Sequence, residues 1–465
     1  MKEVQTLGIL PLGRPTFDVG FAEEKLDAML NALEATGKTL VGHKQLLMDA
    51  DATDSAMDRL QQIAPDAVLI LQVTFTDASA TMRIANRFDQ PLCIWAVPES
   101  RTGGRLRLNA FCGLNLASHA LGLSGRRFSW IYADPMGKVI SKELSELLAG
   151  MRQTATVKPL LSDAEAAAGA RFADSLKGLR IGRLGTHPDG FDTCRYDKAQ
   201  LKSLAGIEVE ELPLDDLFTA AGSVAQTKID TIRRQVAHDL VGIEMVDQDQ
   251  LDRSLRLKAA MDTIGEKGCY DAFAVRCWPE TFTQYGGAVC GPVSMLGEAL
   301  VPCACEADVY GAATQLLLQA VAGSPVFLAD LVDMDVDDNT GVVWHCGQAP
   351  LSMANPEVAA EATIHTNRKM PLLYQFALKP GRVTLVRISQ AHGNQKLIVA
   401  RGEMLQRPMA FTGTSGVVRF DRPVAEVLPD VINSGLEHHM ALAYGDHIGP
   451  LLDAAAALDL PVIRL

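Results

Sequence analysis

Short apolar runs alternate with amphipathic stretches along the first 155 residues. The apolar runs are rich in Val, Ile and Leu, and they predict strands at Thr6–Leu10, Asp66–Val73, Pro91–Val97 and Phe128–Tyr132. The amphipathic stretches predict helices at Phe21–Thr36, Asp54–Ile63, Ala78–Phe88, Leu114–Leu121 and Lys138–Gln153. This alternation indicates a doubly wound parallel sheet, which binds ligands at the carboxyl ends of its strands.

A second unit of the same kind follows, and then the period changes. Strands are expected at Leu179–Leu184, Glu208–Glu211, Ala272–Val275, Leu300–Ala304 and Val326–Leu331. From Thr363 onward apolar residues recur at period two between glycines, which indicates an antiparallel sheet or a small barrel. We therefore expect an α/β protein with two Rossmann-like, doubly wound parallel-sheet domains (residues 1–155 and 156–335) and a C-terminal antiparallel β-barrel-like domain (residues 336–465).

Composition excludes several classes of protein. Of the 465 residues, 48% are hydrophobic and 21% are charged, as in a folded globular protein. Aromatic residues make up only 6%, which argues against a protein that stacks nucleic-acid bases. The formal net charge of −13 opposes a polyanionic partner, because such binding depends on Lys and Arg displacing counterions. A small anionic ligand, which needs only one or two local arginines, stays possible.

The sequence also predicts a cytoplasmic protein without a membrane partner. The N-terminal segment does not resemble a signal peptide, since Glu3 interrupts its basic start. No stretch approaches the roughly 18–20 apolar residues of a membrane span. The nine cysteines are scattered, mostly in apolar surroundings typical of buried free thiols. Because no C-x-x-C pair occurs, we expect neither a structural zinc site nor a thioredoxin-type centre.

Common catalytic motifs are missing. The chain has no P-loop, no G-x-G-x-x-G after its first strand and no G-x-S-x-G, so ATP chemistry, a dinucleotide cofactor and a hydrolase elbow are all disfavoured. The acidic stretch 333–341 resembles the start of a calcium loop. However, Asp338 stands where that loop needs Gly, and Trp344 where it needs Glu. We interpret the stretch as a solvated turn.

Two carboxylates stand out in apolar surroundings. Glu306 follows the expected strand 300–304, and Asp308 can cap the helix that comes next. Asp330 lies 24 residues after Glu306, at the far end of the next expected strand. That spacing matches one strand–helix–strand repeat, which would bring Glu306 and Asp330 side by side. Two such carboxylates repel one another unless a proton or a metal ion lies between them.

Oxygen ligands of this kind favour Mg²⁺ or Mn²⁺, and an added imidazole shifts the preference toward Mn²⁺ or Co²⁺. Two sources of imidazole are available. His345 follows the acidic turn, and His438 and His439 precede a strand near the C-terminus. Because side chains alternate between the faces of a strand, only one of the two adjacent histidines is expected to point at the site.

The sequence resembles the L-fucose isomerase/L-arabinose isomerase superfamily, in its L-fucose isomerase-like branch. The likeness runs in order along nearly the whole chain, and C-E-A-D-V-Y-G-A at 305–312 is its most specific part. The other matching stretches are I-G-R-L-G-T-H-P-D-G-F (181–191), the strand end at Asp330, W-H-C-G (344–347) and H-H-M-A-L-A-Y-G-D (438–446). The resemblance implies two Rossmann-like domains and a C-terminal barrel, with sites at the subunit boundaries of homo-oligomers.

The resemblance also implies a divalent metal ion, usually Mn²⁺, held by Glu306, Asp330 and His439. His345 corresponds to a further histidine that the arabinose branch uses and the fucose branch does not. The implied activity is that of an aldose–ketose isomerase that moves a proton between C1 and C2 of a monosaccharide through a cis-enediol. Glu306 and Asp330 would serve both as ligands and as the acid/base pair. Fucose, arabinose and the sulfonated sugar sulfoquinovose are candidate substrates.

Further side chains are candidates for binding the sugar. Trp278, Glu280 and Gln284 follow a strand and combine an aromatic ring with polar groups, although a capped turn over a core Trp explains them equally well. His345 is also a candidate for binding the sugar, and Arg101 could meet a sulfonate. Arg101, Arg105 and the stretch Asn109–Asn115 could reach the site of an adjoining subunit, although a plain surface loop is the favoured interpretation.

Two other functions fit the same sequence. A non-catalytic sugar-binding protein could be built from two α/β lobes that close on a hinge. A metal-dependent sugar epimerase or lyase would share the enediolate step. An isomerase should contain stoichiometric metal, whereas a sugar-binding protein should not. An isomerase should also form a ketose, whereas an epimerase or lyase should not.

Overall fold

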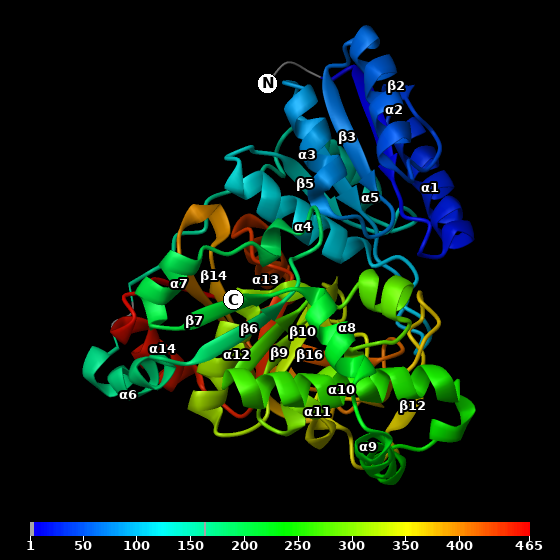
Figure 1. Ribbon diagram of the computed structural model, residues 1–465. Helices are drawn as coiled ribbons and strands as arrows, with labels where there is room; N and C mark the ends of the chain where they lie inside the picture. Colours follow the sequence, from blue (N-terminus) through cyan, green and yellow to red (C-terminus); the bar gives the residue numbers. More distant parts are fainter. Residues whose placement is uncertain (1–3, 162–163) are drawn as a thin grey trace.

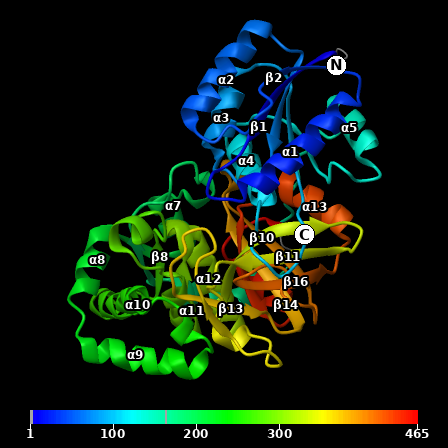
Figure 2. The same cartoon turned by 90° about the vertical axis from the view of Figure 1, so that its right-hand side faces the viewer.

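The computed structural model describes residues 4–161 and 164–465, which form three sheets (Figure 1). The N-terminal sheet has five parallel strands in the order β2-β1-β3-β4-β5. They are β1 (Thr6–Leu12), β2 (Thr39–Gly42), β3 (Ala67–Gln72), β4 (Leu92–Ala96) and β5 (Ser129–Tyr132). The helices are α1 (Val19–Glu34), α2 (Ala50–Ile63), α3 (Ala78–Arg87), α4 (Ala110–Leu123) and α5 (Ile140–Leu148). Figure 2 shows α2 and α3 on one side of this sheet and α1 and α5 on the other.

The second sheet has four parallel strands in the order β7-β6-β8-β9. They are β6 (Arg180–Leu184), β7 (Glu208–Leu212), β8 (Ala272–Val275) and the short β9 (Cys303–Ala304). The helices of this region are α6 (Ala166–Leu176), α7 (Lys198–Ala205), α8 (Leu214–Gly222), α9 (Gln226–Asp239), α10 (Gln248–Gly268), α11 (Cys290–Glu298) and α12 (Val309–Ala322). Both parallel units expected from the sequence are therefore present.

The third sheet is large and mixed, with nine strands in the order β12-β13-β16-β11-β10-β17-β14-β15-β18. They are β10 (Phe327–Asp335), β11 (Thr340–His345), β12 (Glu361–Thr363), β13 (Leu373–Ala377), β14 (Gly381–Ser389), β15 (Lys396–Met404), β16 (Thr414–Phe420), β17 (His439–Tyr444) and β18 (Val462–Arg464). Two helices, α13 (Val424–Asn433) and α14 (Ile448–Ala457), complete the chain. Strand β15 also pairs with β16, so the sheet bends until these two strands meet.

The strand that carries Asp330 belongs to a different sheet from the one predicted. β10 pairs antiparallel with β11 and β17 in the mixed sheet, rather than following β9 in the parallel one. Asp330 consequently lies within a strand, opposite His439, and not at a parallel strand end. The prediction failed because β10 is buried on both faces, and a continuous apolar run does not distinguish a parallel from an antiparallel strand.

The acidic stretch 333–341 contains the expected turn only at 336–339, because its two ends belong to β10 and β11. Asp333 lies within β10 and is buried. Its carboxylate accepts hydrogen bonds from Arg101 Nε at 2.6 Å and from the Tyr132 hydroxyl at 2.6 Å. This ion pair joins the N-terminal unit to the mixed sheet.

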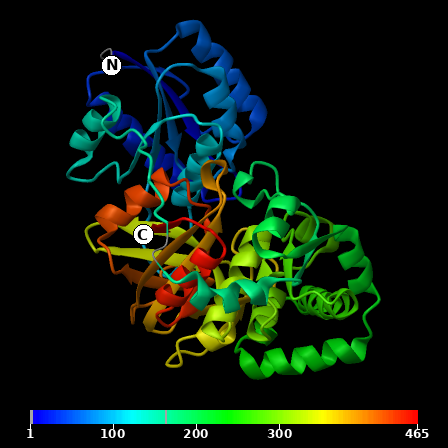
Figure 3. The same ribbon diagram turned by 90° about the vertical axis from the view of Figure 1, so that its left-hand side faces the viewer.

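Helix α4 lies between the N-terminal sheet and the mixed sheet, which explains its composition (Figure 3). Its residues 110–121 are all buried, because β3 and β4 contact it on one side and β10 and α13 on the other. A helix that is mostly apolar on every side is typical of such a position. Helix α4 thereby joins the N-terminal sheet to the mixed sheet. In the part of the chain that the structure describes, no helix is long and apolar enough to span a membrane.

Candidate active site

One cavity is lined by residues from all three regions of this single chain. The N-terminal unit supplies Arg14, Thr16, Phe17, Phe75, Leu106, Asn109 and Cys112. The second unit supplies Phe191, Cys277, Trp278, Phe282, Cys290, Cys305 and Glu306, and the C-terminal region supplies Asp330, Trp344, His345, Cys346, His365, Thr366, Asn367, Arg368 and His438. A mixture of aromatic walls and a few converging polar groups is typical of a small-molecule site.

Glu306 enters this cavity from a strained turn. β9 ends at Ala304, and Glu306 and Ala307 then adopt φ values of 58° and 55°, in the left-handed region. Residues other than Gly and Asn rarely adopt this backbone conformation, which costs on the order of 1–3 kcal/mol and is found mainly at functional sites. The backbone N–H of Glu306 donates to Cys277 Sγ at 3.4 Å.

Both oxygens of the Glu306 carboxylate accept hydrogen bonds. Trp278 Nε1 donates to one oxygen at 3.0 Å, and His438 Nε2 to the other at 2.8 Å. Burial alone would raise the pKa of Glu306. The hydrogen bond and charge of His438 and the hydrogen bond from Trp278 outweigh burial and hold the pKa of Glu306 at about 2. Glu306 is therefore an ionised carboxylate at neutral pH.

Asp330 and His439 face each other across the pairing of β10 with β17. Asp330 Oδ1 lies 3.3 Å from His439 Nε2, and Glu306 Oε2 lies 3.9 Å from the same nitrogen. Both Asp330 Oδ1 and His439 Nε2 are buried, and neither has a hydrogen-bond partner among the described residues. Buried polar atoms without partners are uncommon in folded proteins, and each needs an explanation.

Asp308 determines which nitrogen of the His439 ring donates a hydrogen bond. It caps α12 by accepting from Gly311 N at 2.8 Å, and it accepts from Arg387 through both oxygens, at 2.5 and 3.0 Å. Burial would raise the pKa of Asp308, but the charge and hydrogen bonds of Arg387 and the hydrogen bond of His439 hold it well below its usual range. Since Asp308 can only accept, His439 Nδ1, at 2.9 Å, donates to it.

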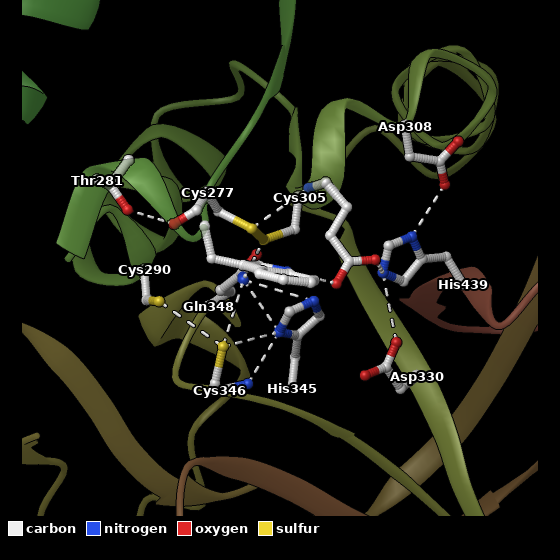
Figure 4. Close-up of a disulfide and its surroundings, with 12 residues drawn as sticks. Cys277, Thr281, Cys290, Cys305, Asp308, Asp330, His345, Cys346, Gln348 and His439 are labelled. Atoms are coloured by element: carbon white, nitrogen blue, oxygen red, sulfur yellow. Dashed lines mark hydrogen bonds and ion pairs between the residues drawn. A yellow bond between two sulfur atoms is a disulfide. The ribbon is translucent and has the colours of Figure 1, made fainter. Parts of the chain in front are cut away.

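In the neutral ring, the opposite nitrogen of His439 therefore carries the lone pair, and it faces Asp330 (Figure 4). The same nitrogen also faces Glu306. Three electron-rich atoms in one buried place are stable only with a cation or a proton between them. Asp330, His345 and His439 offer ligand atoms within 4.8 Å of one another, as do Cys194, Glu306, His438 and His439. Glu306 and Asp330 belong to different groups, and His439 is the residue that the two groups share. Oxygen and imidazole ligands suit a divalent ion such as Mn²⁺, so the residues present fit a metal ion.

His345 is placed differently from His439, although the two rings stack with centroids 5.6 Å apart. Its Nδ1 accepts the backbone N–H of Cys346 at 2.8 Å and is 3.0 Å from Gln348 Nε2. With Nδ1 as acceptor, the proton of a neutral ring is on Nε2. In this arrangement His345 offers an N–H rather than a lone pair.

Both adjacent histidines reach Glu306, in contrast to the expectation that only one would. His438 donates to Glu306 directly, and the two imidazole centroids are 3.9 Å apart. The alternation of faces applies only within a strand, and β17 begins at His439, so His438 precedes it.

Only some of the residues proposed from the sequence to bind the sugar lie at this cavity. Trp278 and His345 line it, whereas the others lie elsewhere. Glu280 and Gln284 line a separate surface hollow, where Glu280 pairs with Arg276 at 2.6 Å. Arg101 is bound to Asp333 and to Thr340 Oγ1, the latter at 2.7 Å, and does not line the cavity.

The cysteines also differ from expectation at one pair. Cys277 and Cys305 form a disulfide beside Glu306, while the other seven cysteines are free thiols, as predicted (Figure 4). Their spacing of 28 residues gave no signal, because the parallel strands β8 and β9 bring them together only in the fold.

Arg14 and Arg368 are charged residues of the cavity that sequence reasoning missed. Arg14 could have been found, since it follows the first strand of a parallel sheet, where such sheets place ligands. Arg368 lies in the connection between β12 and β13 and carries no comparable signal.

Comparisons with known proteins agree with the resemblance seen in the sequence. Residues 8–159 match the fucose/sulfoquinovose isomerase N-terminal domain, and residues 343–465 match the L-fucose isomerase C-terminal domain. Sulfoquinovose isomerase of Priestia megaterium is 29% identical over 456 residues, with 98% of each chain covered. That of Alkalicoccus urumqiensis is 29% identical over 465 residues, with 99% of each chain covered.

A solved periplasmic sugar-binding protein from Legionella pneumophila aligns with 68% of this chain and 94% of its own, at 13% identity. Its TM-score of 0.19 carries no argument about fold or function. The two family matches and the full-length relatives settle the family. The chain belongs to the L-fucose isomerase-like superfamily and is an isomerase.

Proposed function

We propose that this protein is a divalent-metal-dependent aldose–ketose isomerase, with Glu306, Asp330 and His439 as the ligands of the ion. The observation that carries the proposal is that one buried nitrogen, His439 Nε2, faces a carboxylate oxygen of Asp330 and one of Glu306. His439 Nε2 lies 3.3 Å from Asp330 Oδ1 and 3.9 Å from Glu306 Oε2, and two of these atoms have no hydrogen-bond partner in the described chain.

The residues are suited to moving a proton between C1 and C2 of an open-chain sugar. When bound, the ion polarises the carbonyl and the neighbouring hydroxyl group and stabilises the negative charge that develops on them. One carboxylate of the pair Glu306 and Asp330 takes the proton from C2, and a proton returns at C1, while one hydroxyl proton passes from O2 to O1. No atom is gained or lost, and the intermediate is a cis-enediol.

Neighbouring side chains support these roles. Trp278 and His438 fix the Glu306 carboxylate from both sides, which keeps it ionised and oriented as a ligand must be. The His345 N–H is available to a sugar oxygen in the same cavity. The aromatic walls exclude water, which strengthens every electrostatic interaction within the site.

We propose sulfoquinovose as the first substrate to test, because that sugar appears in the names of the full-length relatives. L-Fucose and L-arabinose come next, as neutral aldoses of the wider family. Mn²⁺ is the proposed ion, with Co²⁺ and Mg²⁺ as alternatives.

The test is to incubate the Mn²⁺-loaded protein with each sugar and to follow ketose formation by NMR. We expect a ketose from at least one aldose, and one firmly bound Mn²⁺ per site by elemental analysis. Glu306→Gln should retain no more than a few per cent of the wild-type rate, whereas Glu24→Gln, on the exposed side of α1, should retain all of it.

Other outcomes would point to other functions. Sugar binding without stoichiometric metal and without ketose would indicate a binding protein. Exchange of the C2 hydrogen with solvent without ketose would indicate an epimerase or a lyase. A Glu306→Gln variant with substantial turnover would contradict the assigned role of that carboxylate.

A further inference from the structure

Two arginines lie close to the indole of Trp278 inside the cavity. The guanidinium carbon of Arg14 is 5.1 Å from the ring centroid, and that of Arg368 is 5.7 Å from it. The same indole donates through Nε1 to Glu306 at 3.0 Å. One ring therefore connects the carboxylate proposed to hold the metal with a pair of positive charges further along the cavity.

These charges lack the partners that most arginines of the protein have. The acidic neighbour of Arg14 is Asp77, 3.9 Å away, and Asp77 also caps α3 by accepting from Ser79 N. Over residues 4–161 and 164–465, Arg368 has no carboxylate within 4.0 Å, and neither guanidinium group hydrogen-bonds to the protein. Most other arginines of the fold are paired: Arg101, for example, binds Asp333 at 2.6 Å.

The two charges also work against each other. Burial lowers the pKa of Arg368, and the positive charge of Arg14 lowers it further. Like charges in a half-buried position are destabilising unless an anion lies between them. The chain has 56 acidic against 43 basic residues, so carboxylates are plentiful, yet among the described residues no carboxylate pairs with both arginines.

The fold fixes the two arginines near each other. Arg105 donates from Nε to Asn367 Oδ1 at 3.0 Å and from Nη2 to the carbonyl of Thr16 at 2.7 Å. It thereby ties the loop after β1, which carries Arg14, to the connection between β12 and β13, which carries Arg368. The backbone N–H of Arg14 also donates to Thr74 Oγ1 at 2.9 Å. The pair is thus built from two fixed loops.

We propose that Arg14 and Arg368 form a subsite for the anionic end of an aldose, opposite the end that is isomerised. The inference rests on the proposed isomerase function and adds the residues that would select an anionic sugar, one with a terminal sulfonate or phosphate. Guanidinium groups present paired N–H donors that match the oxygens of such anions. The Trp278 ring between the two ends offers an apolar surface to the sugar.

The test compares sugars that differ only at C6, namely sulfoquinovose, glucose 6-phosphate, glucuronate and glucose, with the wild-type protein and with Arg14→Gln, Arg368→Gln and Arg368→Lys. We expect each Gln variant to raise KM for sulfoquinovose by about 10- to 100-fold while kcat falls less than threefold, because ground-state binding of a charged group is lost. Arg368→Lys should recover part of the loss. Arg234→Gln, on the exposed side of α9, serves as the matched control and should change neither constant.

A second readout does not depend on turnover. Sulfoquinovose is titrated calorimetrically into Glu306→Gln, with and without Arg368→Gln, and we expect the affinity to fall by a similar factor. Mn²⁺ affinity, measured by electron paramagnetic resonance, should be the same in Arg368→Gln and in the wild type, which shows that the metal site is intact. The preferred anion is the one whose KM responds most to the arginine variants.

Unchanged KM and affinity in both Gln variants would overturn the subsite. So would equal losses for sulfoquinovose and glucose, which would indicate a structural role for the arginines. If no aldose yields a ketose but the calorimetric loss is seen, the subsite stands and the isomerase proposal fails. If sulfoquinovose is isomerised and the arginine variants behave as wild type, the reverse holds.

Discussion

Asp308 Oδ2 lies 2.9 Å from His439 Nδ1, on the opposite side of the ring from Asp330. A carboxylate in this position fixes the ring and its tautomer, and it makes the far nitrogen a stronger ligand. We predict that Asp308→Asn weakens Mn²⁺ binding by about 10- to 100-fold, as is usual when such a partner is lost. Equilibrium binding followed by electron paramagnetic resonance measures the change.

A control is needed because Asp308 also caps α12 and neutralises the buried Arg387. Asp247→Asn alters a comparable cap, at the start of α10 and away from the cavity, and should leave Mn²⁺ affinity unchanged. Circular dichroism establishes that Asp308→Asn is folded under the conditions of the titration. Wild-type Mn²⁺ affinity in a folded Asp308→Asn would show that His439 does not depend on this partner.

His345 and His439 should respond differently to the same substitution. His439 directs a lone pair at Asp330 and Glu306, whereas His345 uses its Nδ1 to accept from Cys346 N and presents an N–H. We predict that His439→Gln loses bound metal on dialysis. His345→Gln should keep at least half of its metal and lose at least tenfold in kcat, because a Gln amide replaces the N–H in a poorer position. Elemental analysis and steady-state kinetics on the two variants decide the matter. Loss of metal from both would make His345 a ligand.

The sequence largely predicted which segments form helices and which form strands, but it did not predict the pairing of β10. The alternation of short apolar runs with amphipathic helices predicted both parallel units, because burial on two faces leaves a clear pattern. In β10 the same pattern misled, since that strand is also buried on both faces although its neighbours β11 and β17 run antiparallel to it. Strand β2, with only four half-exposed residues, left no pattern to detect.

The sequence could predict those site residues that are polar and lie within apolar stretches of the chain. Glu306, Asp330 and His439 stood out for that reason, and the structure brings them together although the strand argument for Asp330 was incorrect. The roles of Arg101 and Glu280 could not be read in this way, because an arginine in a loop looks the same whether it meets a ligand or a carboxylate of the protein. Only the fold shows that Asp333 and Arg276 are their partners.

The ion pair of Arg101 with Asp333 leads to a prediction on stability rather than on substrate binding. Asp333 is 4% exposed, and removing its partner leaves a buried charge uncompensated, which typically costs about 3–5 kcal/mol. We predict that Arg101→Met lowers the free energy of unfolding by this amount, measured by urea denaturation, and changes KM less than twofold. Adding Asp333→Asn to Arg101→Met should recover most of the loss, because the uncompensated charge is then absent. A large rise in KM with unchanged stability would restore Arg101 as a sugar-binding residue.

Asp338, in the turn between β10 and β11, gives a prediction about acid stability. Hydrogen bonds from Arg407 Nη2 at 3.0 Å and from Thr340 Oγ1 at 2.7 Å lower its pKa from 3.8 to about 2. Because the folded pKa lies below the unfolded one, the stabilisation is fully present above pH 4 and is lost as the pH falls through 3.8 toward 2. The side chain is 35% exposed, so screening by water limits the effect to about 1 kcal/mol.

The measurement is the difference in urea midpoint between the wild type and Asp338→Asn at several pH values. At pH 6 the wild type should be more stable by about 1 kcal/mol. The difference should shrink steadily below pH 4, because the Asp338 carboxylate is then protonated in a growing fraction of molecules and resembles the uncharged Asn. Asp337→Asn is the control, since Asp337 is exposed and has no hydrogen bond or ion pair to any described residue. A difference that stayed constant from pH 6 to pH 3 would mean that the substitution Asp338→Asn disturbs the turn itself, and that the charge on Asp338 contributes nothing to stability.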